Sequence, residues 1–140
     1  MGRLLGIDYG DKRFGLAVSD PTQTLARPLE TIEGQSEFWR RLEVILADGE
    51  IETLVLGLPR NMDGSLGPKA QTVLAFRKRL EERSGLPVET WDERLTTVQA
   101  ERNLRETGMS LNQRRRRVDE VAAQIILQSF IDRKQAHGEA

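Results

Sequence analysis

Three acidic residues from distant parts of the chain are candidates to bind a divalent cation. Asp8 ends the run RLLGID, which is typical of a strand. Glu93 comes after a second such run, PVETW, and after the adjacent Asp92. Asp119 lies in a C-terminal segment with helical periodicity. The chain has no cysteine and only one histidine, and ligation by oxygen alone suits Mg²⁺ or Mn²⁺. Such a site can hold two cations that activate water and stabilise the leaving oxygen of a phosphodiester. The acids therefore predict metal-dependent hydrolysis of phosphodiester bonds.

Helical periodicity places Asp119 on the side of the last helix that should face the rest of the fold. The apolar residues that share this face follow it at spacings of 3, 4, 7 and 11 and are Ala122, Ala123, Ile126 and Phe130. A carboxylate that points into a protein needs a partner. If this helix crosses the sheet near the strand that precedes Glu93, the three carboxylates converge.

Each acid also has a purely structural interpretation. Asp8 could accept hydrogen bonds from the turn amides of YGDK, and Glu93 could be a solvated strand end. Asp119 could pair with Arg115 or Arg116 one helical turn earlier. The joint pattern of the three acids favours the functional interpretation.

The elements that must position these acids follow from hydrophobic periodicity and turn residues. Strands are expected over 3–8, 13–20, 26–32, 53–59 and 87–91, and helices over 36–47, 68–83 and 111–135. Capping-box spacing predicts further helix starts at Thr96 and Ser110. The order indicates an α/β fold with a mixed five-stranded sheet, three antiparallel strands then two parallel, and helices on both faces. The connection over 58–69 is long enough to be a functional flap.

Composition limits the classes of function. The 140 residues are expected to form one domain over 1–140 with a flexible tail over about 136–140, and the formal net charge is −1. Nucleic acid must therefore be met by a local basic patch rather than by bulk charge. The only histidine, His137, lies in the polar tail, so a Ser-His-Asp triad is improbable. No apolar stretch could span a bilayer, so we expect a cytoplasmic protein without a membrane partner.

Four segments of the chain resemble the signature blocks of the YqgF family, also called RuvX. They are GIDYGDKRFGLAVSD, LVLGLPRNMDGSLGPKAQ, DERLTTVQAE and RRRRVDEVAAQIIL, and they occur in order across almost the whole chain. The family is similar to the RuvC-type resolvases of the ribonuclease H-like superfamily. The resemblance implies a ribonuclease H-like fold and a nuclease that processes the 5′ end of the small-subunit (16S) ribosomal RNA precursor. Likeness to RuvC alternatively implies a Holliday-junction resolvase.

The resemblance also implies roles for the acids. It makes Asp8, Glu93 and Asp119 both catalytic residues and ligands of Mg²⁺ or Mn²⁺. Successive strand residues face opposite sides of a sheet, so only one of Asp92 and Glu93 should point into the site, and the family pattern favours Glu93. RuvC-type enzymes carry a fourth acid three residues after the helical one, where this chain has Ala122.

Basic residues form the second constellation. Four consecutive arginines follow the helix start at Ser110, where the helix dipole disfavours positive charge by about 0.3 to 1 kcal/mol per exposed residue. Phosphate binding would explain this placement, whereas pairing with acids such as Glu120 is the structural alternative. The residues expected to bind nucleic acid are Lys12, Arg13, Arg60, Lys69, Arg94, Arg114, Arg115, Arg116 and Arg117.

Two other classes of protein compete with the nuclease. The segment GIDYGDKRFGLAVSD also resembles the first phosphate loop of sugar and acetate kinases, but those enzymes clamp their nucleotide between two lobes and this chain has the length of one. A non-catalytic RNA-binding factor of ribosome assembly is the third possibility. The partner of a nuclease would be precursor rRNA or branched DNA. A junction resolvase should be a homodimer, and an rRNA-trimming enzyme could be a monomer.

Overall fold

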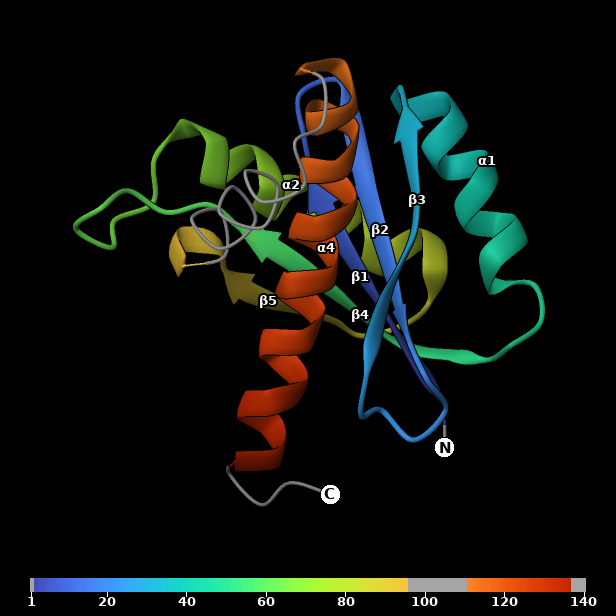
Figure 1. Cartoon of the computed structure of the whole chain (residues 1–140). Helices are drawn as coiled ribbons and strands as arrows, with labels where there is room; N and C mark the ends of the chain where they lie inside the picture. Colours follow the sequence, from blue (N-terminus) through green and yellow to red (C-terminus); the bar gives the residue numbers. More distant parts are fainter. Residues whose placement is uncertain (1, 96–110, 137–140) are drawn as a thin grey trace.

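The fold is a mixed five-stranded sheet covered by helices on both faces (Figure 1). The structure, a computed structural model, describes residues 2–95 and 111–136, and of these it describes residues 95 and 111–120 by their backbone alone. The strands are β1 (Arg3–Tyr9), β2 (Arg13–Ser19), β3 (Ala26–Glu33), β4 (Ile51–Leu58) and β5 (Val88–Asp92). The helices are α1 (Gln35–Leu46), α2 (Pro68–Ser84) and α4 (Leu111–Ala136), with a short 3-10 turn, η1 (Glu93–Leu95), after β5.

The strand order β3-β2-β1-β4-β5 agrees with the expected topology. The first three strands are antiparallel, whereas β4 pairs with β1, and β5 with β4, in parallel. Parallel neighbours need crossover helices, and α1 and α2 supply them. The carboxyl ends of β1, β4 and β5 therefore lie at the same end of the sheet.

Two hydrophobic layers bury the sheet. On one face, α1 and α2 pack over a core that includes Leu5, Ile7, Phe38 and Phe76. On the other face, α4 crosses the sheet (Figure 1). Its residue Ile126 joins a second core. Because both faces are covered, β1 is an apolar run instead of an alternating one.

The helix boundaries follow the predicted signals. Helix α2 begins with Pro68 in its first turn and ends at Gly85, which adopts the left-handed conformation with φ of 70°. Helix α4 starts at Leu111 as expected and extends to Ala136, one residue into the segment predicted as a tail. The predicted helix starts at Thr96 and Ser110, and the tail beyond Ala136, lie outside the described residues.

A glycine in β1 lets α4 approach the sheet closely. A Cβ atom on Gly6 would lie 2.9 Å from Cβ of Leu127 and 3.2 Å from the carbonyl oxygen of Ala123. Neither neighbour is the movable end of a flexible side chain. Only a residue without a side chain therefore fits under α4 at this point of β1.

Gly6→Ala should lower the free energy of unfolding by about 1 to 3 kcal/mol, because the added methyl group must push α4 away from β1. Thermal or urea denaturation followed by circular dichroism measures this change. Gln71→Ala in α2 is a control, since Gln71 is exposed and its side chain supports no packing of α4. Equal stabilities for the Gly6→Ala variant and the wild type would contradict the close approach.

Candidate active site

Asp8 lies on the face of β1 that α4 covers, near the carboxyl end of the strand. Its neighbours Ile7 and Tyr9 belong to the opposite layer, so alternation turns Asp8 towards the α4 side. The pKa of Asp8 is raised well above its ordinary value, first by burial and then by a hydrogen bond and charge repulsion with Glu93. Two acids from distant parts of the chain thus meet at this point.

Glu93 reaches Asp8 because β4 carries a glycine at the intervening position. A Cβ atom on Gly57 would lie 2.9 Å from Cγ of Glu93 and 2.6 Å from Cδ1 of Ile126. Gly57 pairs with Trp91 in the sheet, just before β5 ends. The glycine therefore leaves room for the Glu93 side chain between β4 and α4. Sequence reasoning missed Gly57, although its position inside an apolar strand was a usable signal.

Asp92 is turned towards two arginines instead. Its carboxylate accepts a hydrogen bond from Nε of Arg94 at 2.9 Å and forms ion pairs with Arg94 at 2.7 Å and with Arg60 at 3.9 Å. The hydrogen bond from Arg94 is the largest cause that lowers the pKa of Asp92. Of the two adjacent acids, Glu93 contacts Asp8, as expected. Because β5 ends at Asp92 and Glu93 begins η1, the change from strand to 3-10 turn contributes to this separation.

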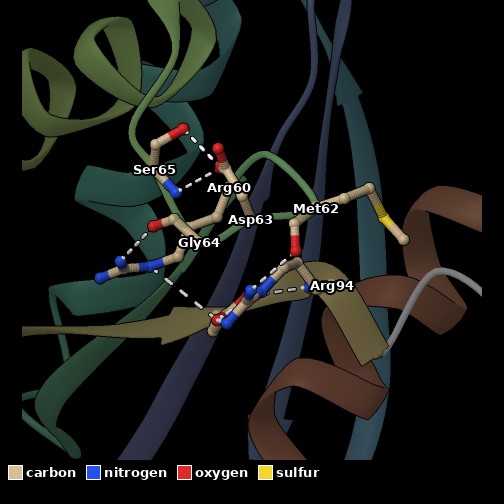
Figure 2. Close-up of polar contacts among 7 residues, drawn as sticks. Arg60, Met62, Asp63, Gly64, Ser65 and Arg94 are labelled. Atoms are coloured by element: carbon tan, nitrogen blue, oxygen red, sulfur yellow. Dashed lines mark hydrogen bonds and ion pairs between the residues drawn. The ribbon is translucent and has the colours of Figure 1, made fainter.

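The connection between β4 and α2, expected to be a flap, is tied by its own hydrogen bonds. Nη1 of Arg60 donates to the carbonyl oxygen of Gly64 at 2.9 Å, and the amide and hydroxyl of Ser65 donate to Asp63 at 2.9 and 2.6 Å (Figure 2). Arg94 reaches the loop from η1, and its Nη1 lies 3.4 Å from the carbonyl oxygen of Met62. The loop and the end of β5 therefore form one connected polar cluster.

The third predicted acid lies in α4, where the structure describes only the backbone at residue 119. Further along the helix, Ala122, Ala123 and Ile126 are buried and Phe130 packs against the α4-side core. The predicted apolar face of the helix is thus confirmed, whereas the contacts of the Asp119 side chain lie outside the described residues. Within the described part of the chain, no three acidic or histidine side chains are grouped to hold a metal.

The predicted basic residues have different environments. Lys69, in the first turn of α2, is exposed, and its charge counteracts the rise in the pKa of Asp8. Lys12 is exposed in the turn between β1 and β2, whereas Arg13 pairs with Glu33 at 3.5 Å. Arg60 and Arg94 hold Asp92. The side chains of the four arginines at 114–117 lie outside the described residues.

The donor set fits a hard divalent cation. Asp8 and Glu93 supply carboxylate oxygens, the ligands that Mg²⁺ and Mn²⁺ prefer. Burial and the neighbouring Glu93 raise the pKa of Asp8, so ionising both carboxyls in the absence of a cation is unfavourable. A bound cation would remove the repulsion between the two carboxylates. The Asp8–Glu93 pair therefore supplies two of the oxygen donors that such an ion would need.

Asp8→Asn should raise the melting temperature in buffer with a chelator at neutral pH, because it removes one of two repelling carboxylates. A raised folded-state pKa means that the native state binds more protons than the unfolded state between the ordinary Asp pKa, 3.8, and the raised value. Stability therefore falls as pH rises through that window. The advantage of the variant should shrink as pH is lowered towards 4.

Asp92→Asn is the matched control, with the opposite sign. The pKa of Asp92 is lowered, so its ionised form stabilises the fold above the ordinary pKa, and that contribution is lost on acidification. Its loss should cost about 1 kcal/mol or less, because these ion pairs are partly exposed. Melting curves of both variants between pH 4 and 7.5 make the comparison. A lower melting temperature for Asp8→Asn at neutral pH would show that Asp8 serves the fold.

The sequence of this chain is similar to that of a family of known proteins. The family model described as "RuvX: Holliday junction resolvase" matches residues 2–133. A relative from Caldanaerobacter subterraneus subsp. tengcongensis, named "Putative pre-16S rRNA nuclease", is 46% identical over 93% of this chain and 96% of its own length. A relative with the same name from Listeria monocytogenes serotype 4b is 42% identical over 93% of this chain and 97% of its own length.

Solved structures show the same fold at low sequence identity. Thermus thermophilus RuvC in complex with a Holliday junction substrate aligns with a TM-score of 0.58 at 19% identity, over 96% of this chain and 97% of RuvC. The fowlpox virus resolvase in complex with junction DNA aligns with a TM-score of 0.55 at 14% identity, over 94% and 97%. The predicted ribonuclease H-like fold is thereby confirmed. On the match over residues 2–133 and the identity to its curated relatives, this chain belongs to the RuvX family of nucleases.

Proposed function

We propose that this nuclease depends on a divalent cation held by Asp8, Glu93 and Asp119. The observation that carries the proposal is the contact between the Asp8 and Glu93 carboxyls at the carboxyl end of the parallel strands. Asp119 joins them on the sequence pattern of α4, whose following turns pack on this face of the sheet. Membership of a nuclease family supports hydrolysis as the reaction.

The residues of the chain have distinct tasks in this mechanism. Asp8 must lose its proton to bind a cation, and the nearby charge of Lys69 favours the ionised form. Glu93 supplies the second carboxylate. Its side chain packs next to Gly57, where a Cβ atom would also contact Ile126. When bound, Mg²⁺ or Mn²⁺ would activate water and stabilise the leaving oxygen. Asp92 stays outside this group and keeps Arg60 and Arg94 beside it, where they could contact phosphates.

The proposed substrate is the precursor of 16S ribosomal RNA, cut at its 5′ end. The names of the curated relatives support this choice, since they match almost the full length of this chain. Maturation of ribosomal RNA would place the protein in the cytoplasm. No helix in the described residues is long and apolar enough to cross a membrane.

Resolution of Holliday junctions is the second candidate. The family description and the fold shared with RuvC favour it. Two symmetric cuts need two active sites, so this function requires a homodimer, whereas rRNA processing is compatible with a monomer. A non-catalytic role in ribosome assembly is the remaining alternative. Side-by-side assays of labelled precursor rRNA and a synthetic four-way junction, with Mg²⁺ and with Mn²⁺, distinguish the three.

Asp8→Asn, Glu93→Gln and Asp119→Asn should each lower the cleavage rate by about 100-fold or more, because a cation contributes several kcal/mol to the transition state. The changes remove charge and conserve volume, so the fold should persist in circular dichroism spectra. Asp92→Asn is the neighbouring control and should retain most of the maximal rate. Normal turnover in any of the three variants would remove that residue from the metal site.

Lys12→Ala combined with Lys69→Ala should weaken binding to nucleic acid of any sequence and reduce its salt dependence. The logarithmic slope should fall by about 0.9 for each phosphate that is no longer neutralised on duplex, or by about 0.7 on single strands. Filter binding over a range of salt concentrations measures the slope. Lys78→Ala, exposed on α2, is the control. An unchanged slope in the double variant would move the binding surface to the arginines at 114–117.

A further inference from the structure

A cleft separate from the two carboxylates lies between the edge strand β5 and the second half of α4. Its volume is about 400 Å³, within the range of pockets that bind small ligands. Strand β5 is the last strand of the sheet, so the cleft opens at the sheet edge. The residues that line it and carry the argument are Thr53, Thr90, Trp91, Phe130, Arg133 and Lys134.

Two aromatic side chains form the apolar part of the cleft. Trp91 and Phe130 are each partly exposed and pack by their buried sides against the α4-side core. Nε1 of Trp91 is buried and has no hydrogen-bond acceptor among the described residues. An unpaired buried donor is destabilising, so an acceptor at this place would be favourable. Aromatic surfaces of this kind stack nucleobases without sequence preference.

Two cations stand beside the aromatic pair. Arg133 and Lys134 form no ion pair or hydrogen bond with any residue that the structure describes. Arg3 and Arg77, by contrast, pair with Glu50 and Glu81. Cations without acidic partners next to a stacking surface are the two components of a site for single-stranded nucleic acid.

One acid and two hydroxyls complete the lining. Glu89 is exposed at the rim and would repel a phosphate, which therefore belongs on the side of Arg133 and Lys134. The Glu89 carboxylate could instead accept from the exocyclic amino group of a base. The hydroxyls of Thr53 and Thr90 can donate or accept, so they suit the base or the sugar. The charge distribution orients a nucleotide with its base inward.

The cleft lies on the same face of the sheet as the acid pair. Val55 and Gly57 of β4 face α4, and their partners in β5 are Glu89 and Trp91. Glu89 and Asp92, the last residue of β5, are separated by three residues, which in a strand is about 10 Å, and Glu93 follows directly. A polynucleotide running along β5 could occupy the cleft and the acid pair together.

We propose that this cleft binds one nucleotide of the substrate strand a short distance from the bond that is cut. The base stacks on Trp91 and Phe130, and the phosphate pairs with Arg133 and Lys134. The identification of the bound strand as the substrate rests on the proposed nuclease function, whereas binding of the strand does not require cleavage. A free mononucleotide carries the same base and phosphate groups, and the experiment below distinguishes it from a nucleotide within a strand.

The chain has two tryptophans, which makes the cleft observable by fluorescence. Trp39 lies in the core on the opposite face of the sheet, beneath the guanidinium of Arg83 at 4.2 Å. Trp39→Phe leaves Trp91 as the only tryptophan emitter. We expect a short single-stranded RNA to quench this emission saturably at low salt, with a nucleoside 5′-monophosphate much weaker. A quench by the monophosphate that equals or exceeds that by the RNA would overturn the assignment to a strand.

Arg133→Gln with Lys134→Gln, in the same background, should weaken the RNA-dependent quench about tenfold and flatten its salt slope by about 0.7 for each phosphate that is no longer neutralised. Lys78→Gln on α2 is the control for the loss of one positive charge, and it should change neither the RNA-dependent quench nor its salt slope. In the wild-type background the double variant should raise KM for cleavage and leave kcat nearly unchanged, because the cations act in binding. Wild-type RNA affinity in the double variant would refute the site.

Asp8→Asn distinguishes failure of this inference from failure of the proposed function. The variant should abolish cleavage and keep the quench of Trp91, since Asp8 does not line the cleft. A quench in a protein that cleaves neither substrate would support the cleft and refute the nuclease mechanism. Cleavage of precursor rRNA without any quench of Trp91 would support the nuclease mechanism and refute the cleft as a binding site.

Discussion

The close packing of α4 on the sheet is the constraint from which the site follows. The helix can approach because β1 and β4 carry Gly6 and Gly57 beneath it, where any Cβ atom would meet α4 at less than 3 Å. The same closeness buries Ile126 and Leu127 against the strands. It also closes the space around the Glu93 side chain, which has room only above Gly57. A helix held further away would leave both acids in water.

Burial and function oppose each other at Asp8. The pKa of this carboxyl is raised by burial and by Glu93, so ionising Asp8 beside Glu93 costs stability. On the other side of β5, Asp92 is stabilised by Arg94 and Arg60, and its pKa is lowered. The two pKa values are thus shifted in opposite directions, because Asp8 faces the covered side of the sheet and Asp92 faces the loop after β4. A bound cation would relieve the repulsion between Asp8 and Glu93, whereas Asp92 already has two arginine partners.

The basic side chains also fall into two groups, those with an acidic partner and those without one among the described residues. Arg60 and Arg94 are occupied by Asp92 and by loop carbonyls, so they stiffen the region around the acids (Figure 2). Arg133 and Lys134 have no acidic partner in the part of the chain that the structure describes. The first pair maintains the shape of the acid site, and the second leaves positive charge available at the sheet edge. Charge left unpaired beside aromatic rings is suited to a ligand that brings both phosphate and base.

Local sequence determined the elements, their order and the sheet, because apolar periodicity, the Pro68 start and the Gly85 end of α2 are short-range signals. It also pointed to Asp8 and to the adjacent acids Asp92 and Glu93, since these lie at the ends of predicted strands. Only the tertiary structure decided that Glu93 and not Asp92 meets Asp8, that Gly57 makes the meeting possible, and that the loop after β4 is tied to η1. The cleft at Trp91 likewise had no signal in the sequence. These features arise from contacts between segments far apart in the chain, and the periodicity of one segment carries no information about which side chain of another will fill the space beside it.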